Sequence, residues 1–156
     1  MTTRDGEIRY VTLRADTLMG MFRRLPEPLR AQALAALANS AAEHGGDSAR
    51  RYLESGAGDA AALLATIEKT AAELGWGTWR FGECNVTRLA LEVQRSPFAE
   101  GHGAAGEPVC APIRGMLEAV AGLVLGGACE AREVQCLACG AASCRFEANL
   151  RIRSKP

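Results

Sequence analysis

The sequence predicts an α+β fold in which helices pack on an antiparallel sheet of about four to five strands. Two observations carry this prediction. Helical patterns are grouped in the first half of the chain, and the hydrophobic period changes near Thr78 from the helical value to strict alternation. One long helical pattern then separates two pairs of expected strands. Because helices and strands do not alternate one by one, antiparallel pairing is favoured over a parallel sheet.

The first half of the chain is expected to hold one strand and a group of helices. Ile8–Leu13 is rich in residues that favour a strand. Pro28 suits the first turn of a helix, and the step His44-Gly45-Gly46 predicts where that helix ends. Asp59 suits the cap of a later helix, and Gly75 its end. The expected helices cover Thr17–Arg24, Pro28 to His44, Asp47–Leu53 and Asp59–Gly75.

The second half of the chain is dominated by strand patterns around one helix. In Arg88–Gln94, Leu89, Leu91 and Val93 alternate with polar residues, which predicts a strand with one solvated face. Between Cys110 and Leu125 the apolar residues recur at helical spacing. Ser96–Pro108 and Leu137–Ser143 are expected to be loops. The expected strands cover Thr78–Phe81, Arg88–Gln94, Cys129–Cys136 and Cys144–Arg151.

Length and charge limit the possible functions. The 156 residues suit one domain, which we expect to span residues 1–156. The formal net charge is zero, so no broad basic field favours nucleic acid. The apolar stretch Met116–Leu125 is too short to span a bilayer, and the polar N-terminus does not resemble a signal peptide. A cytoplasmic protein with reduced thiols is therefore expected.

Cysteine is abundant, with six residues in the chain. In a reducing compartment such a cluster predicts a metal site before it predicts disulfides. Zinc prefers four protein ligands, and two sets compete. A local set uses the C-x2-C step and slightly better fits the spacing alone; it consists of Cys129, Cys136, Cys139 and Cys144. A second set consists of Cys110, Glu133, Cys136 and Cys144, and it requires Cys136 to lie past the regular strand or beside a bulge.

A longer motif favours the second set through a family resemblance. It reads Pro108-Val109-Cys110, Gly115, then Glu133-x2-Cys136-x3-Gly140-x3-Cys144-Arg145-Phe146-Glu147. This pattern resembles the 4-vinyl reductase domain family, which includes the sensory domains of phenol- and xylene-responsive activators. Ser96-Pro97-Phe98 resembles a further motif of that family, in which an asparagine often stands at the position of Arg95.

The resemblance implies a fold, a metal and an assembly. The fold would be the one shared with haem-based nitric-oxide sensors and a Golgi tethering subunit. Zinc would be held by Cys110, Glu133, Cys136 and Cys144, and with four protein ligands it would be structural. Members of the family commonly form homodimers through their N-terminal helices, so a homodimer is expected here.

The scarce aromatic residues are the candidates for a ligand site. Trp79 and Phe81 follow one another on an expected strand, and Phe98 lies in the next loop. Core packing is one interpretation of these residues. The other is an apolar pocket between sheet and helices, where relatives bind their ligand. The candidate ligand-binding residues are Trp79, Phe81, Phe98, Phe22, Tyr52 and His102.

These observations favour a binding protein for a small apolar or aromatic molecule, acting as a sensor or carrier. A sensor would need a downstream protein partner. One alternative is a tetrapyrrole-binding accessory protein or reductase of bacteriochlorophyll-type synthesis; another is a protein-interaction module without a ligand. No dinucleotide fingerprint is present, and with two histidines no catalytic constellation stands out, so an enzyme is not favoured.

Overall fold

The computed structural model describes residues 2–5 and 8–151 and has the expected α+β architecture. Its main sheet is antiparallel and four-stranded, in the order β3 (Thr78–Cys84), β4 (Arg88–Gln94), β6 (Cys144–Leu150) and β5 (Cys129–Gln135). Strand β4 has the predicted bounds, and its side chains Leu89, Leu91 and Val93 are buried as the alternation predicts. The other face of this sheet carries charged residues.

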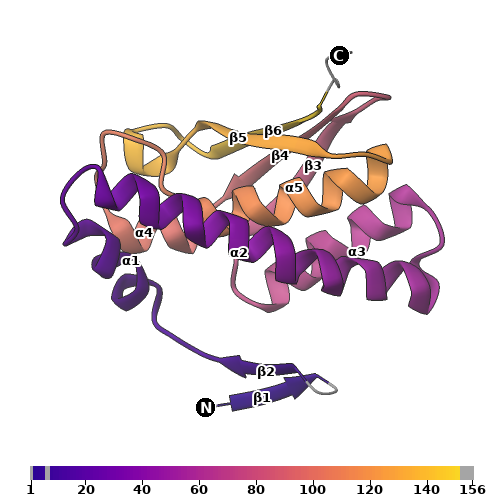
Figure 1. Cartoon of the computed structure of the whole chain (residues 1–156), viewed down its shortest axis with the longest axis horizontal. Helices are drawn as coiled ribbons and strands as arrows, with labels where there is room; N and C mark the ends of the chain where they lie inside the picture. Colours follow the sequence, from indigo (N-terminus) through magenta and orange to yellow (C-terminus); the bar gives the residue numbers. More distant parts are fainter. Residues whose placement is uncertain (1, 6–7, 152–156) are drawn as a thin grey trace, which may run out of the picture.

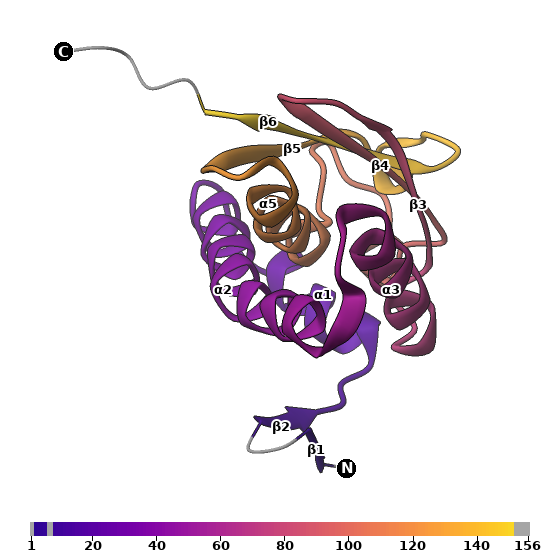
Figure 2. The same ribbon diagram turned by 90° about the vertical axis from the view of Figure 1, so that its right-hand side faces the viewer.

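Helices cover the apolar face of the sheet (Figure 1). The long helix α5 (Ala111–Leu125) lies directly on the strands, and α3 (Ala60–Glu73) packs beside it on β3. Helix α2 (Leu29–Tyr52) crosses the outer side of α5, so the body has three layers (Figure 2). Helix α1 (Ala15–Arg23) packs mainly against α4 (Pro97–His102). In the ranges 2–5 and 8–151, no helix has the length and hydropathy needed to cross a membrane.

The prediction that His44-Gly45-Gly46 ends a helix is wrong. Helix α2 continues through both glycines to Tyr52 and absorbs the helix expected at Asp47–Leu53. Close packing explains Gly45, because a Cβ atom there would lie 1.9 Å from Sδ of Met116 on α5. A glycine pair at a helix–helix contact thus produces the same local pattern as a glycine stop signal.

Two further predictions need correction. The strand expected at Ile8–Leu13 forms, over Ile8–Val11, a separate hairpin in which β2 pairs only with β1 (Thr2–Asp5) and does not join the main sheet. The expected loop Ser96–Pro108 contains α4, whose N-cap Ser96 accepts a hydrogen bond from the Ala99 amide. At Arg95, directly before this cap, φ is +57°. Asparagine tolerates this left-handed conformation better than most residues, and here arginine adopts it.

Candidate functional site

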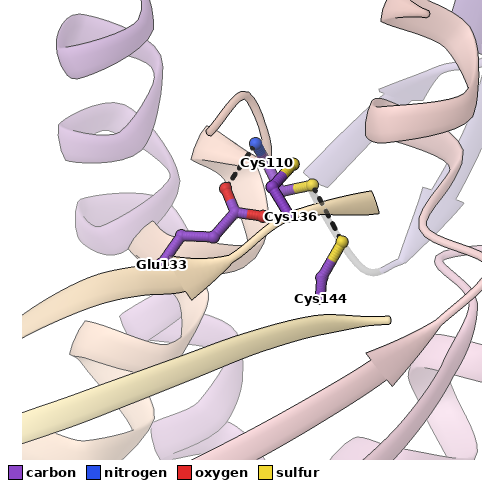
Figure 3. A group of neighbouring side chains, drawn as sticks. All are labelled: Cys110, Glu133, Cys136 and Cys144. Carbon is purple, nitrogen blue, oxygen red and sulfur yellow. Dashed lines mark hydrogen bonds between the residues drawn. The ribbon is translucent and has the colours of Figure 1, made fainter. Parts of the chain in front are cut away.

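Four potential metal ligands converge from three segments of the second half of the chain (Figure 3). Cys110 is the N-cap residue of α5, Glu133 lies near the end of β5, and Cys144 begins β6. Cys136 follows β5 directly. Their ligand atoms all lie within 4.8 Å of one another, and the three cysteines are fully buried. The cluster could therefore hold a metal ion.

An irregularity at the end of β5 brings Glu133 and Cys136 to one site. In a regular strand these two side chains would point to opposite faces. The pairing of β5 with β6 shifts register between Glu133 and Gln135, and Cys136 already lies outside the strand. A short helical turn, Leu137–Cys139, then leads the chain back toward Cys144. This is the bulge that the second ligand set requires.

Backbone amides donate hydrogen bonds to the potential metal-ligating atoms of the cluster and hold them in place. The Cys110 amide donates to Oε1 of Glu133 at 2.9 Å, and the Leu137 amide donates to Sγ of Cys144 at 3.3 Å. The sulfur atoms of Cys110 and Cys144 are 3.7 Å apart. Oε2 of Glu133 is buried, and within the described part of the chain it has no hydrogen-bond partner. A buried carboxylate oxygen without a partner is costly unless a cation or proton satisfies it.

Ser96 also contacts the cluster, although it was not among the predicted site residues. Its hydroxyl lies 3.1 Å from Sγ of Cys110, and its side chain is fully buried. The same oxygen caps α4, so Ser96 links that helix to the cluster. The Ser96-Pro97-Phe98 motif was the sequence signal that could have pointed to Ser96, but a motif does not reveal what the Ser96 hydroxyl contacts.

The protonation states of the free cluster are strongly coupled. Hydrogen bonds from Cys110 and Cys144 lower the pKa of the Cys136 thiol far below its ordinary value. The same hydrogen bonding to Cys136, with Cys144 and burial, raises the pKa of Cys110. The pKa of Cys144 is raised to about 12, because hydrogen bonding to Cys136 and burial outweigh the lowering contact with Cys110. Burial, followed by the charge of Cys136, raises the pKa of Glu133 to about 8.

The remaining cysteines lie outside this cluster. Cys129 is buried, and its thiol is directed to the Gly127 carbonyl oxygen at 3.5 Å. Cys139 and Cys84 are exposed. The structure thus assembles the set that includes Cys110 and Glu133, and it does not assemble the purely local set.

A cavity of about 540 Å³ lies between α2 and α3, and both tryptophans of the chain line it. Trp76 and Trp79 form one wall, together with Ile67 of α3 and Met116 of α5. Trp76 was not among the predicted ligand-binding residues; its position three residues before Trp79 was the available sequence signal. The indole of Trp79 donates to the Trp76 carbonyl at 3.0 Å, which fixes its orientation.

The predicted ligand-binding residues are not all in this cavity. Trp79 and Tyr52 line it. Phe98 packs edge-on against Trp76 with ring centroids 5.0 Å apart, and Phe81 packs against Trp79 at 6.3 Å. Neither of these two rings lines the cavity. Phe22 is buried in the core, whereas His102 lines a second, more polar hollow beside β5.

Comparison with known proteins agrees with this architecture. The family model of the V4R domain matches residues 89–150. Among curated proteins, no sequence matches the chain.

Three solved structures show the same fold. The phenol-responsive sensory domain of the transcription activator PoxR, in complex with phenol, is 18% identical with a TM-score of 0.80, over 96% of this chain and 80% of that one. A vinyl-4-reductase family protein from Methanocaldococcus jannaschii is 16% identical with a TM-score of 0.55, over 86% and 89%. A trafficking protein particle complex subunit 3 from Naegleria fowleri, covalently bound to palmitic acid, is 13% identical with a TM-score of 0.60, over 91% and 98%.

These likenesses bear out the fold expected from the family motif, including its relation to a trafficking subunit. The matched segment runs from β4 to the end of β6 and therefore contains all four residues of the cysteine and glutamate cluster. Residues 89–150 of this chain are thus similar to the V4R domain family, whose model they match.

Proposed function

We propose that this chain is a zinc-containing binding protein for a small apolar or aromatic ligand and acts as a sensor or carrier. The observation that carries the proposal is the cavity of about 540 Å³ walled by Trp76 and Trp79. Ligand sites of this kind are mostly apolar, with a few polar groups that orient the ligand. The PoxR domain, which has this fold, was solved with phenol, and this supports an aromatic ligand.

The donor set of the cluster supports zinc as its metal. Three thiolates and one carboxylate suit zinc in a closed, tetrahedral site. Zinc–sulfur bonds of about 2.3 Å at tetrahedral angles separate two sulfur atoms by about 3.8 Å. The Cys110 and Cys144 sulfur atoms are 3.7 Å apart, and Glu133 has an unsatisfied carboxylate oxygen beside them. These residues therefore fit the ion.

A zinc ion with four protein ligands would serve structure rather than chemistry, because no coordination position would remain for water. Its ligands come from the start of α5 and from both strands of the β5–β6 hairpin. The ion would join the helix that packs on the cavity to the edge of the sheet. In this proposal the chain's own residues bind and orient a ligand.

The metal assignment is tested by metal analysis of protein purified under reducing conditions. We expect one zinc ion per chain in the wild type and a large loss in Cys110→Ala. The matched control is Cys139→Ala, which removes an exposed thiol from the loop beside Cys136 and should keep its zinc. Full zinc content in Cys110→Ala would overturn the proposed ligand set, and a metal-free wild type would overturn the zinc site.

The ligand site is tested with the neutral fluorescent probe N-phenyl-1-naphthylamine, an apolar aromatic molecule suited to such cavities. We expect its binding to quench emission from Trp76 and Trp79. Thr70→Phe should abolish binding, because Thr70 lines the cavity and the added ring fills it. Lys69→Phe adds the same ring to an exposed position of the same helix and should leave binding intact. Equal binding by both variants would contradict the site.

A sensor must pass its signal on, and we propose a second copy of this chain as the first recipient, with a downstream protein partner beyond it. Exposed apolar side chains near the N-terminal helices support this proposal, among them Val11, Leu13 and Met21. Light scattering should report a dimer for the wild type and a monomer for Leu13→Asp. A monomeric wild type would contradict it.

A further inference from the structure

The cavity between α2 and α3 has two chemically different sides. Its inner wall is apolar and carries Trp76, Trp79 and Met116. The more exposed part of its lining, called the rim below, includes polar residues, and three of them, His44, Ser48 and Arg51, come from α2. Their spacing of four and then three residues places them on one face of that helix. A ligand in this cavity would therefore meet apolar surface at one end and a row of polar side chains at the other.

The acidic side chain on the rim of the cavity forms an ion pair, whereas the basic side chains there form none with the described residues. Asp47 is the acidic side chain of the cavity lining, and it already forms an ion pair with Arg50 of the same helix. Arg51, which lines the cavity, has no ion-pair partner among the side chains of the described residues. Arg9 adds a second guanidinium from β2, whose residues Ile8 to Tyr10 lie along the mouth of the cavity. The lining thus carries two guanidinium groups, Arg9 and Arg51, against one carboxylate, Asp47, which is paired with Arg50.

We infer that the ligand of this cavity is an amphipathic anion, with an aromatic or apolar body against the tryptophans and an acidic group at Arg51. The inference rests on the proposed function, because it assigns the chemical class of ligand to the same cavity. A guanidinium binds a carboxylate or sulfonate through charge-assisted, often bidentate hydrogen bonds. Burial of the ligand's apolar body away from water contributes most of the affinity, and its charged end determines how the ligand is oriented.

Two fluorescent probes that differ by one acidic group test this inference. They are 8-anilinonaphthalene-1-sulfonate, which is anionic, and N-phenyl-1-naphthylamine, which has the same ring system without the sulfonate. Trp76 and Trp79 are the chain's two tryptophans, and both line the cavity, so quenching of their emission reports binding at this site. We expect the anionic probe to bind more tightly, and its affinity to fall with added salt while that of the neutral probe does not.

The decisive variant is Arg51→Gln. It should weaken binding of the anionic probe about three- to tenfold, as loss of one partly exposed charged contact implies, and leave the neutral probe unchanged. Retained binding of the neutral probe also shows that the variant is folded and its cavity intact. The control Lys69→Gln removes the same charge from an exposed position outside the lining and should affect neither probe.

Each other outcome overturns the inference in a recognisable way. Equal affinity for both probes, unchanged in Arg51→Gln, would show that the rim does not select an acid, while ligand binding as such stands. Equal weakening of both probes by Arg51→Gln would assign Arg51 to the shape of the cavity rather than to charge recognition. Absence of tryptophan quenching by either probe would overturn the proposed function together with this inference.

Discussion

Glycine residues carry the contact between α2 and α5. A Cβ atom at Gly115 would lie 2.1 Å from the backbone oxygen of Ala38, so α2 can approach this closely only because Gly115 has no side chain. At Gly45 the obstacle would be the flexible end of Met116. A larger residue at Gly115 would therefore displace backbone, whereas one at Gly45 would displace only a side chain.

Gly115→Ala is expected to lower the free energy of unfolding by about 2 kcal/mol or more, because the added methyl group displaces backbone in a packed interface. The better helix propensity of alanine recovers only about 1 kcal/mol of that loss. Gly122→Ala, in the same helix, places its Cβ 3.4 Å from the nearest atom and should be close to neutral. Denaturant unfolding measures both variants, and equal stabilities would contradict the close-contact interpretation.

Proton release accompanies metal binding at the cluster. Near pH 7 the raised pKa values of Cys110, Cys144 and Glu133 keep these groups protonated in the free site, whereas Cys136 is a thiolate. Since zinc binds the deprotonated forms, its binding should release about three protons, and acid should weaken it. Below about pH 8 the affinity should therefore fall steeply as pH falls.

Calorimetry of zinc binding in buffers of different ionisation enthalpy counts these protons. Glu133→Gln cannot release a proton from position 133, so its count should be lower by about one. An unchanged count in this variant would remove Glu133 from the set of groups that zinc deprotonates.

At the scale of secondary-structure elements, the cluster joins the start of α5 to the β5–β6 hairpin. The hairpin is on one side of the sheet, and β5 is its edge strand. Edge strands have fewer backbone partners than central ones, so an additional link should matter most there. Glu118 of α5 provides one further link, because its carboxylate accepts a hydrogen bond from the Ala131 amide at 3.2 Å.

Removal of the metal with a chelator should loosen this region selectively. Amide hydrogen exchange is expected to rise in β5, in the turn around Leu137–Cys139 and in the first turn of α5, with little change in α2 and α3. Exchange that rises uniformly over the chain would indicate that zinc supports the whole fold rather than this junction.

At the scale of the whole molecule, the proposed ligand site and the proposed metal site lie in different parts. The cavity is lined by α2, α3, the start of β3 and Met116, whereas the cluster lies at the N-terminus of α5 and at the β5–β6 hairpin. Because α5 is shared, both events should raise the stability of the same folded state. Ligand binding to the folded state alone contributes about 2.7 kcal/mol at a hundredfold excess over Kd.

The neutral probe at that excess should raise Tm by several degrees, in the zinc-loaded and in the chelated protein alike. Thermal unfolding monitored by circular dichroism measures the shift. Thr70→Phe is the control, since its filled cavity should show no shift. A shift confined to the zinc-loaded protein would show that the cavity forms only when the metal is bound.

Local patterns in the sequence determined most of the second half of the fold, with α4 as the exception. The alternation of Arg88–Gln94 gave strand β4 with its bounds, and the helical spacing after Cys110 gave α5. The family resemblance indicated the cluster from the spacing of Cys110, Glu133, Cys136 and Cys144. A family motif keeps residues at the spacing that brings them together in the fold. Short-range periodicity reports which face of an element is buried, and these elements obey it.

The tertiary structure alone decided the rest. It determined that Gly45 and Gly46 make a helix contact instead of a stop, that β2 pairs outside the main sheet, and that Trp76 lines the cavity with Trp79. It also placed the Ser96 hydroxyl on Cys110 and left Arg51 without an ion-pair partner in the described part of the chain. The helix contact of Gly45 and the position of the Ser96 hydroxyl depend on residues far apart in the sequence, and close packing selects among local patterns that look the same in one dimension.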